Sequence, residues 1–220
     1  MDGILQTGTV IIDKKTYELD TDGSLKGYTP KKKSSKKKSS DKSATSDKSG
    51  TSTAKKSVAL TFDDGPSSFT GRLLDCLEEN NAKATFFMVG TEIASFPDEV
   101  KRMKKLGCEL GNHTYDHKDL ATLSSDEISS EIARVDEQLV NLTGEGASVV
   151  RPPYGSVNDT VKSTVGTPMI LWSIDTLDWK TQDVESTVEE VMNNVKDGSI
   201  ILMTRYLQHL CRCSRDPDPA

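Results

Sequence analysis

Two adjacent carboxylates, Asp63 and Asp64, end the apolar run VALTF and are followed at once by a Gly-Pro pair. A strand that ends in paired acids presents both at its carboxyl end, which is where the active sites of α/β proteins lie. Asp, Gly and Pro are also ordinary turn residues, so a simple turn explains this stretch as well. A chemical role for the two acids therefore needs support from other parts of the chain.

Two of the three histidines, His113 and His117, lie four positions apart in the stretch HTYDH. On a helical turn this spacing places both imidazoles on one face. Two histidines and one carboxylate can hold a divalent metal and leave positions open for water and substrate. One of the paired acids can then be the third ligand, while the other acts as a base on the activated water. A solvated helix face is the alternative explanation of the histidine pair.

Strand and helix patterns alternate from residue 57 to residue 203, which predicts parallel βαβ units. The strands are continuously apolar, so both faces of the sheet should be covered. An open doubly wound sheet and a barrel both fit this order. The expected strands are 57–62, 84–90, 108–114, 148–153, 168–175 and 199–203, and the expected helices are 71–80, 97–107, 124–144, 158–166 and 183–198.

Polar motifs follow the carboxyl ends of four of these strands. Asp63 and Asp64 follow the first strand, HTYDH the third, RPPYG the fourth and DTLDW the fifth. A rim built from the ends of several strands is the active-site arrangement of a (β/α) barrel. The placement of the polar residues therefore favours the barrel.

The motifs TFDDGP, HxxxH, RPPYG and DTLDW, in this order on successive strands, resemble those of the polysaccharide deacetylase family. Members of this family, carbohydrate esterase family 4, are metal-dependent enzymes that remove acetyl groups from sugar polymers. The resemblance covers about residues 57–203. It implies an α/β fold, a distorted (β/α) barrel with fewer than eight regular units, and a divalent metal, usually zinc and sometimes cobalt or nickel.

The resemblance also implies the roles of the most polar residues. Asp64, His113 and His117 match the metal ligands of the family, and Asp63 matches the catalytic base. Arg151 matches a residue that pairs with the base and keeps it ionised, a role that a bidentate guanidinium suits. An ordinary surface ion pair is the alternative for Arg151.

Further matches lie around the implied substrate groove. Tyr154 matches a position whose backbone N–H helps to bind the oxyanion of the tetrahedral intermediate. Asp175 falls in the motif that tunes a catalytic histidine and counts among the implied catalytic residues. Pro153 and Trp179 are implied to contact substrate with Tyr154, and Leu202 fits an apolar pocket for the acetyl methyl group.

One family position is not matched. After the strand 199–203 the family has a histidine that protonates the leaving amine, whereas this chain has Thr204. Threonine cannot donate a proton as an imidazolium does. The tail 204–220 has no helix or strand periodicity, so we expect the C-terminal closing elements of the barrel to be missing. A one-base frameshift after Met203 would explain both features, because the codons for the tetrapeptide at 204–207 can encode His-Asp-Ile in the neighbouring frame.

Two further regions precede the predicted catalytic domain 57–203. Residues 1–30 predict a β-hairpin that resembles one unit of the cell-wall-binding repeats of Gram-positive bacteria. Residues 31–56 predict a disordered linker whose ten lysines and two aspartates give a charge of +8. Without interleaved aromatic or arginine residues, this linker predicts attraction to an anionic surface such as a cell wall rather than nucleic-acid binding.

Composition excludes several other classes of protein. No apolar run approaches the roughly 18 to 20 residues that span a bilayer. No signal peptide follows Met1, so we expect that the export signal is lacking or that the sequence begins inside a longer one. The four cysteines form neither a disulfide framework nor a zinc-binding pair.

The sequence therefore predicts hydrolysis of acetyl groups from an N-acetylated cell-wall polysaccharide, with peptidoglycan favoured over chitin or xylan by the hairpin and the lysine-rich linker. An extracellular or cell-wall location follows from the resemblance. A phosphoesterase would need a second metal and more ligands on the rim. A carbohydrate-binding relic that has lost its activity is the other alternative, because Thr204 replaces the catalytic acid.

Overall fold

The computed structural model describes residues 8–12, 15–19 and 57–204. Strands β1 (Gly8–Ile12) and β2 (Lys15–Leu19) pair in antiparallel fashion. Their resemblance to a cell-wall-binding repeat stays a prediction. The predicted linker 31–56 and the tail from residue 205 onwards lie outside the described residues.

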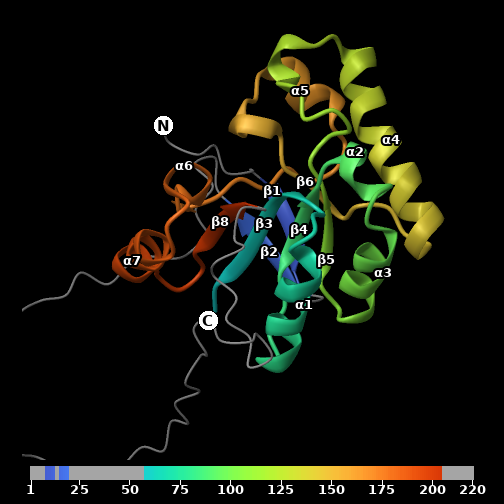
Figure 1. Ribbon diagram of the computed structural model, residues 1–220. Helices are drawn as coiled ribbons and strands as arrows, with labels where there is room; N and C mark the ends of the chain where they lie inside the picture. The colour runs from blue at the N-terminus through green and yellow to red at the C-terminus, as the bar shows by residue number, and fades with distance from the viewer. Residues whose placement is uncertain (1–7, 13–14, 20–56, 205–220) are drawn as a thin grey trace, which may run out of the picture.

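Six strands form one sheet in which every pair is parallel. They are β3 (Ala59–Gly65), β4 (Thr85–Met88), β5 (Glu109–Asn112), β6 (Val149–Val150), β7 (Ile174–Asp175) and β8 (Ile200–Thr204). Their order is β6-β5-β4-β3-β8-β7, so β3 lies between β4 and β8 (Figure 1). The predicted α/β fold with parallel βαβ units is confirmed.

The segment 168–175 closes this sheet into a distorted barrel. Its first residues pair with β6, because the N–H of Ile170 donates to the carbonyl of Val150 and the N–H of Val150 donates to the carbonyl of Pro168. Its last residues, Ile174 and Asp175, pair with β8 instead. The continuous strand predicted for 168–175 is therefore wrong in detail, since the segment changes partner midway. Among the described residues the ring of strand contacts has no gap. The prediction that C-terminal closing elements are missing concerns residues after Thr204, which lie outside the described residues.

Helices cover the strands on the outside. Figure 1 shows α3 and α4 side by side along one flank, and α6 and α7 together beside β8. The longer helices are α1 (Thr70–Glu79), α3 (Pro97–Lys105), α4 (Ser125–Thr143), α5 (Asp159–Thr164) and α7 (Val184–Asn194). The short elements are α2 (Gly90–Ile93), α6 (Asp178–Thr181) and the 3₁₀ turns η1 (Leu120–Thr122) and η2 (Pro153–Gly155).

Helix α4 has well-defined signals at both ends. Its N-terminus is a capping box: Ser124 Oγ accepts from the N–H of Glu127, and the Glu127 carboxylate accepts from the N–H of Ser124. Its C-terminus is Gly144, whose φ of +82° is the left-handed conformation that glycine adopts most readily. The inner face of α4 buries three apolar side chains and one carboxylate, Ile128, Val135, Leu139 and Glu131.

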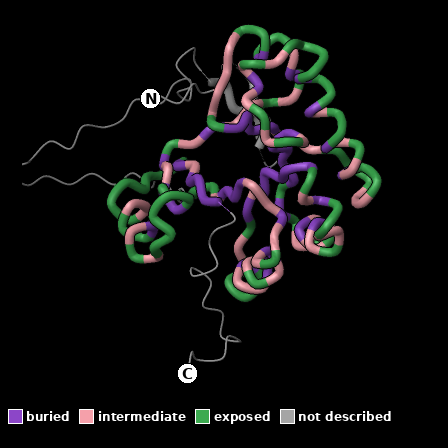
Figure 2. Tube along the Cα trace, turned by 45° about the horizontal axis from the view of Figure 1, so that its top comes forward, coloured by how far each residue is buried: buried purple, intermediate pink, exposed green. Residues whose placement is uncertain are grey.

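The core lies between the strands and the inner faces of these helices. Figure 2 shows buried residues concentrated along the strands and exposed residues along the outer sides of the helices. The main cluster includes Phe62, Phe86, Met88, Leu110 and Ile201. Within the ranges that the structure describes, no helix has the length and apolar character needed to cross a membrane.

Candidate active site

The polar motifs meet at the carboxyl ends of neighbouring strands, as the sequence predicts. Asp63 and Asp64 lie in β3, His113 directly follows β5, and Arg151 directly follows β6. Because all of these strands run in the same direction, their carboxyl ends share one edge of the barrel.

A local irregularity in β3 places both acid side chains at this edge of the barrel. Side chains of adjacent residues in a regular strand point to opposite faces. In β3, however, Asp63 pairs with Phe87 and Gly65 pairs with Met88, so Asp64 is an extra residue with a φ of +66°. Such a bulge reorients a side chain, and here it brings the Asp64 carboxylate to the two histidines.

Asp64, His113 and His117 form a compact group of possible metal ligands. Asp64 Oδ1 lies 3.5 Å from His113 Nε2 and 3.2 Å from His117 Nε2. In a tetrahedral site with bonds of about 2.1 Å to each ligand, two ligand atoms are roughly 3.4 Å apart. The three residues therefore fit one divalent ion of the size of zinc.

The environment of this group favours metal binding. Partial burial opposes ionisation of Asp64, but the hydrogen bonds and charges of the two histidines outweigh it and hold the pKa of Asp64 well below its usual value. His113 Nδ1 lies 2.6 Å from the carbonyl oxygen of Arg151, which can only accept a hydrogen bond. Nδ1 therefore carries the proton in the neutral ring, and Nε2 is left free to bind a metal.

The helical turn expected for HTYDH is wrong. Residues 113–119 form a loop, in which Thr114 has a φ of +67° and His117 a φ of +55°. The two imidazole rings nevertheless lie edge to face, with 4.9 Å between their centroids. The histidines converge because of this loop conformation and not because of helical spacing.

Asp63 is paired with Arg151 inside the barrel. Arg151 Nη1 donates to Asp63 Oδ1 at 2.6 Å, and the arginine side chain is 0% exposed. This single-nitrogen contact replaces the bidentate pairing that the sequence suggested. The other guanidinium nitrogens donate to the carbonyls of Ile170 and Leu171. Burial raises the pKa of Asp63, while the charges of Arg151 and His113 oppose that rise.

The RPPYG motif forms the turn η2 beside the histidines. Tyr154 has a φ of +61°, and its side chain is 70% exposed. Its ring lies edge to face against His117, with 4.9 Å between centroids. Pro153, the first residue of this turn, is buried. Tyr154 therefore stands at the solvent-facing side of the ligand group.

The two acids of the DTLDW motif have different hydrogen-bond partners in the structure. Asp175 Oδ1 accepts from the N–H of Leu177, whereas the buried Asp178 accepts from both the N–H and the hydroxyl of Thr204 through Oδ2, at 2.8 and 3.1 Å. The sequence motif predicted Asp175 as a site residue but not Asp178, although it contains both acids. Burial raises the pKa of Asp178, against the lowering effect of the Thr204 hydrogen bonds.

The remaining predicted residues differ in exposure. Trp179 in α6 is half exposed, whereas Leu202 in β8 is buried. Thr204 is the last residue of β8 and lies opposite Asp63 in the strand register. The predicted irregular tail therefore begins one residue too early, because Thr204 is part of the sheet. Its side chain is buried against Asp178, at the edge that carries the other site residues.

Comparison with known families shows to which family the chain belongs. The sequence model of the polysaccharide deacetylase family matches residues 50–167. The chain belongs to this family. Its fold, a distorted barrel of parallel strands and helices, agrees with that assignment, and Asp64, His113 and His117 form a possible metal site, in agreement with the metal dependence of the family.

Two peptidoglycan deacetylases are among the relatives of this polysaccharide deacetylase chain. It is 41% identical over 149 residues to the peptidoglycan-N-acetylglucosamine deacetylase PgdA of Listeria monocytogenes, covering 67% of this chain and 32% of that protein. It is 43% identical over 152 residues to the peptidoglycan-N-acetylglucosamine deacetylase of Bacillus cereus, covering 67% of this chain and 55% of that protein. The chain thus spans about one third to one half of these relatives.

A solved structure extends the comparison to three dimensions. The peptidoglycan deacetylase PdaC from Bacillus subtilis superposes with a TM-score of 0.69 at 36% identity. The match covers 72% of this chain and 80% of that one. The similarity therefore includes most of the described barrel.

Proposed function

We propose that the domain hydrolyses acetyl groups from an N-acetylated cell-wall polysaccharide, with N-acetylglucosamine of peptidoglycan as the preferred sugar. The observation that carries this proposal is the convergence of Asp64, His113 and His117 beside the Arg151-paired Asp63. Three ligands with open positions next to one separate carboxylate are what metal-assisted hydrolysis requires.

The residues have distinct chemical tasks in this proposal. A divalent ion, zinc in preference to cobalt or nickel, would polarise the acetyl carbonyl and lower the pKa of water towards neutrality. Asp63 accepts the proton of the attacking water, since its second oxygen faces the ligand group, with Oδ2 3.7 Å from His113 Nε2. Arg151 fixes the orientation of this carboxylate.

Substrate contacts are assigned to the residues that match the substrate-binding positions of the family. The backbone N–H of Tyr154 is assigned to the oxyanion, and the exposed rings of Tyr154 and Trp179 are assigned to the sugar faces. The buried Leu202 is assigned to the acetyl methyl group, and Pro153 shapes the turn. Asp175 keeps its predicted role in the catalytic motif.

The choice of peptidoglycan is supported by the relatives that carry this substrate in their names. The lysine-rich segment 31–56 supports it as well, because a positive charge favours contact with an anionic wall polymer. An extracellular or wall-associated location follows from the same proposal.

A second candidate is a carbohydrate-binding relic with impaired catalysis. It is favoured by Thr204, whose hydroxyl stands next to Asp178 where the family has its acid histidine. A hydroxyl with no titration near neutrality cannot protonate a leaving amine efficiently.

One experiment separates the two candidates. The full chain is loaded with zinc and incubated with N-acetylated peptidoglycan fragments and with chitooligosaccharides, and acetate release and polymer pull-down are both measured. Acetate release supports the deacetylase, and preference for the peptidoglycan fragments supports the substrate assignment. Pull-down without acetate release supports the relic. A chain that neither releases acetate nor retains the polymers contradicts both.

A further inference from the structure

A buried carboxylate on α4 is bonded to three residues of the loop 113–119, which we call the histidine loop. Glu131 is 4% exposed and lies on the inner face of the helix among apolar residues. A buried carboxylate is stable only when it is hydrogen-bonded or paired. Its Oε2 accepts from the backbone N–H groups of Tyr115 and Asp116, at 2.9 and 2.8 Å. Its Oε1 accepts from Lys118 Nζ at 3.0 Å.

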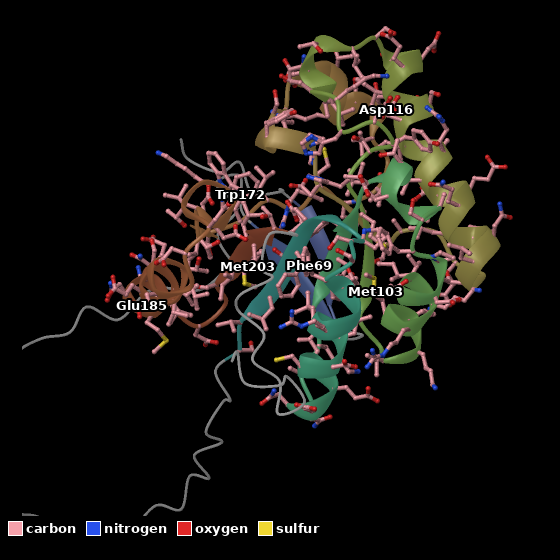
Figure 3. All side chains as sticks on the ribbon, in the orientation of Figure 1. Phe69, Met103, Asp116, Trp172, Glu185 and Met203 are labelled. Carbon is pink, nitrogen blue, oxygen red and sulfur yellow. The ribbon has the colours of Figure 1, made fainter. Side chains whose placement is uncertain are left out.

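These donors lie on the segment that joins the two histidine ligands. Tyr115 and Asp116 stand between His113 and His117, and Lys118 directly follows. Figure 3 labels Asp116 next to α4, in agreement with these hydrogen bonds. Glu131 therefore holds the loop through two backbone N–H groups and the Lys118 ammonium.

Helix α2 holds the same loop from another side. The N–H of Gly90 donates to the carbonyl of Thr114, and the N–H of Thr91 donates to the carbonyl of Tyr115. The ring of Tyr115 packs directly on Gly90, where an added Cβ would lie 2.3 Å from Tyr115 Cδ2. Arg134 of α4 stacks over that ring at 3.3 Å from its centroid. The backbone of the loop is thus bonded to α2 through its carbonyls and to α4 through its N–H groups.

The loop needs such restraints because of its conformation. Thr114 and His117 both have positive φ values, which residues with a Cβ rarely adopt. Such conformations persist where the surrounding structure enforces them. Without the Glu131 carboxylate, two N–H groups would lose their acceptor, and the loop could relax away from the geometry that joins His117 to Asp64.

We propose that Glu131 is a positioning residue for the metal site: its carboxylate fixes the histidine loop so that His113 and His117 reach one ion together with Asp64. The proposal rests on the proposed function for the identity of the site. Groups that orient metal ligands from outside the coordination sphere typically change metal affinity by 10- to 100-fold when they are removed.

Four variants of the full chain test this role. Glu131→Leu removes both acceptor oxygens, whereas Glu131→Gln keeps one oxygen for the two backbone N–H groups. Lys118→Met removes the ion pairs of Lys118 with Glu131 and with Asp116, and it keeps the carboxylate that accepts from the two backbone N–H groups. Glu127→Gln is the matched control on the same helix, because it weakens the capping box, and its charge interaction with the loop involves Lys118, which Lys118→Met tests separately.

Zinc affinity is measured by competition with a chelating dye, and the visible spectrum of the cobalt-loaded chain reports on ligand geometry. We expect Glu131→Leu to bind zinc roughly 10- to 100-fold more weakly and to alter the cobalt spectrum. Glu131→Gln and Lys118→Met should retain most of the affinity. Glu127→Gln should lower the unfolding temperature and leave zinc affinity unchanged.

Amide hydrogen exchange of the metal-free chain gives a second readout. In Glu131→Leu the amides of Tyr115 and Asp116 should exchange roughly 5- to 10-fold faster, the change expected for one lost hydrogen bond. Unchanged zinc affinity and unchanged exchange in Glu131→Leu would overturn the proposal, as would an equal loss of affinity in Glu127→Gln. A parent chain that binds no zinc would count against the proposed function, while the exchange rates would still decide the role of Glu131 in the loop.

Discussion

Arg151 Nη1 donates to Asp63 Oδ1 at 2.6 Å, although the two residues are 88 positions apart in the sequence. The same guanidinium donates to the carbonyls of Ile170 and Leu171, in the segment that closes the barrel. One side chain therefore joins the proposed base to the place where the closing segment passes from β6 towards β8. Arg151 is consequently both a site residue and a major structural contact.

Arg151→Met should be strongly destabilising. Removal of one partner from a buried ion pair leaves an uncompensated charge, and the cost is typically about 3–5 kcal/mol. The measurement is the free energy of unfolding in urea. Arg102→Met is the control, because Arg102 pairs with the partly exposed Asp75 and Glu78 and should cost about 1 kcal/mol or less. Equal losses of unfolding free energy in the two variants would show that the buried pair contributes no more to stability than the partly exposed pair.

Replacement of either histidine ligand by alanine should abolish stoichiometric zinc binding. His113 and His117 supply two of the three candidate ligands, so each single variant leaves two ligands, which are too few to retain the ion. Metal analysis after dialysis should find about one zinc per parent chain and almost none in the variants. His209→Ala, which changes the third histidine of the sequence, should leave the zinc content unchanged. Undiminished zinc in a His113→Ala, His117→Ala double variant would exclude the site.

The two adjacent acids should behave differently. Asp63→Asn should keep zinc and lose deacetylation by roughly 100-fold or more, the scale of general-base removal. Asp64→Asn should lose both zinc and activity, because Asp64 contacts both histidines. Zinc content and acetate release are measured together, in a Thr204→His background if the parent is inactive. Identical zinc contents in the two variants would contradict this division of roles.

Thr204→His should increase acetate release by roughly 100-fold or more, the contribution of a positioned general acid. The imidazole would replace a hydroxyl that hydrogen-bonds to Asp178, so a carboxylate is already in place to orient it. Thr204→Val removes the hydroxyl without adding an acid and should not increase activity. Equal activity of the histidine and valine variants would mean that residue 204 is not the site of the missing acid.

Asp178→Asn should change how stability depends on pH. Because burial raises the pKa of Asp178 above 3.8, the folded chain holds this proton more tightly than the unfolded chain does. The resulting stabilisation is complete below the unfolded pKa and is lost as the pH rises through the folded pKa. The stability of Asp178→Asn relative to the parent should therefore increase from about pH 4 to pH 7. Unfolding curves that keep a constant difference across this range would contradict the raised pKa.

Local patterns in the sequence predicted much of the fold but not its irregular points. The alternation of apolar strands with amphipathic helices identified the βαβ order, and the polar residues at strand ends identified Asp63, Asp64 and the histidine pair. The bulge at Asp64 was not predicted because it depends on pairing with β4. The partner change within 168–175 likewise depends on two strands that are distant in the sequence.

Two residues were missed for related reasons. Asp178 and Asp175 are equivalent in the sequence motif, and only the tertiary structure places Asp178 against Thr204. Glu131 occupies one position of an amphipathic helix, where a carboxylate usually indicates a solvated face. Its burial is explained by backbone N–H groups of a loop, which have no signature in the sequence.

The position of β3 in the sheet has a consequence for how the chain matures. β3 carries Asp63 and Asp64 and is flanked by β4 and β8, and Leu60 on β3 pairs with Ile201 on β8. During vectorial synthesis β3 emerges early, whereas β8 is the last of the described strands to leave the ribosome. The acid-bearing strand therefore keeps one edge open until about 140 further residues have been made. Assembly of the barrel edge that holds the candidate ligands is thus completed late in the synthesis of the described residues, because β3 gains its second neighbour in the sheet only after β8 has emerged.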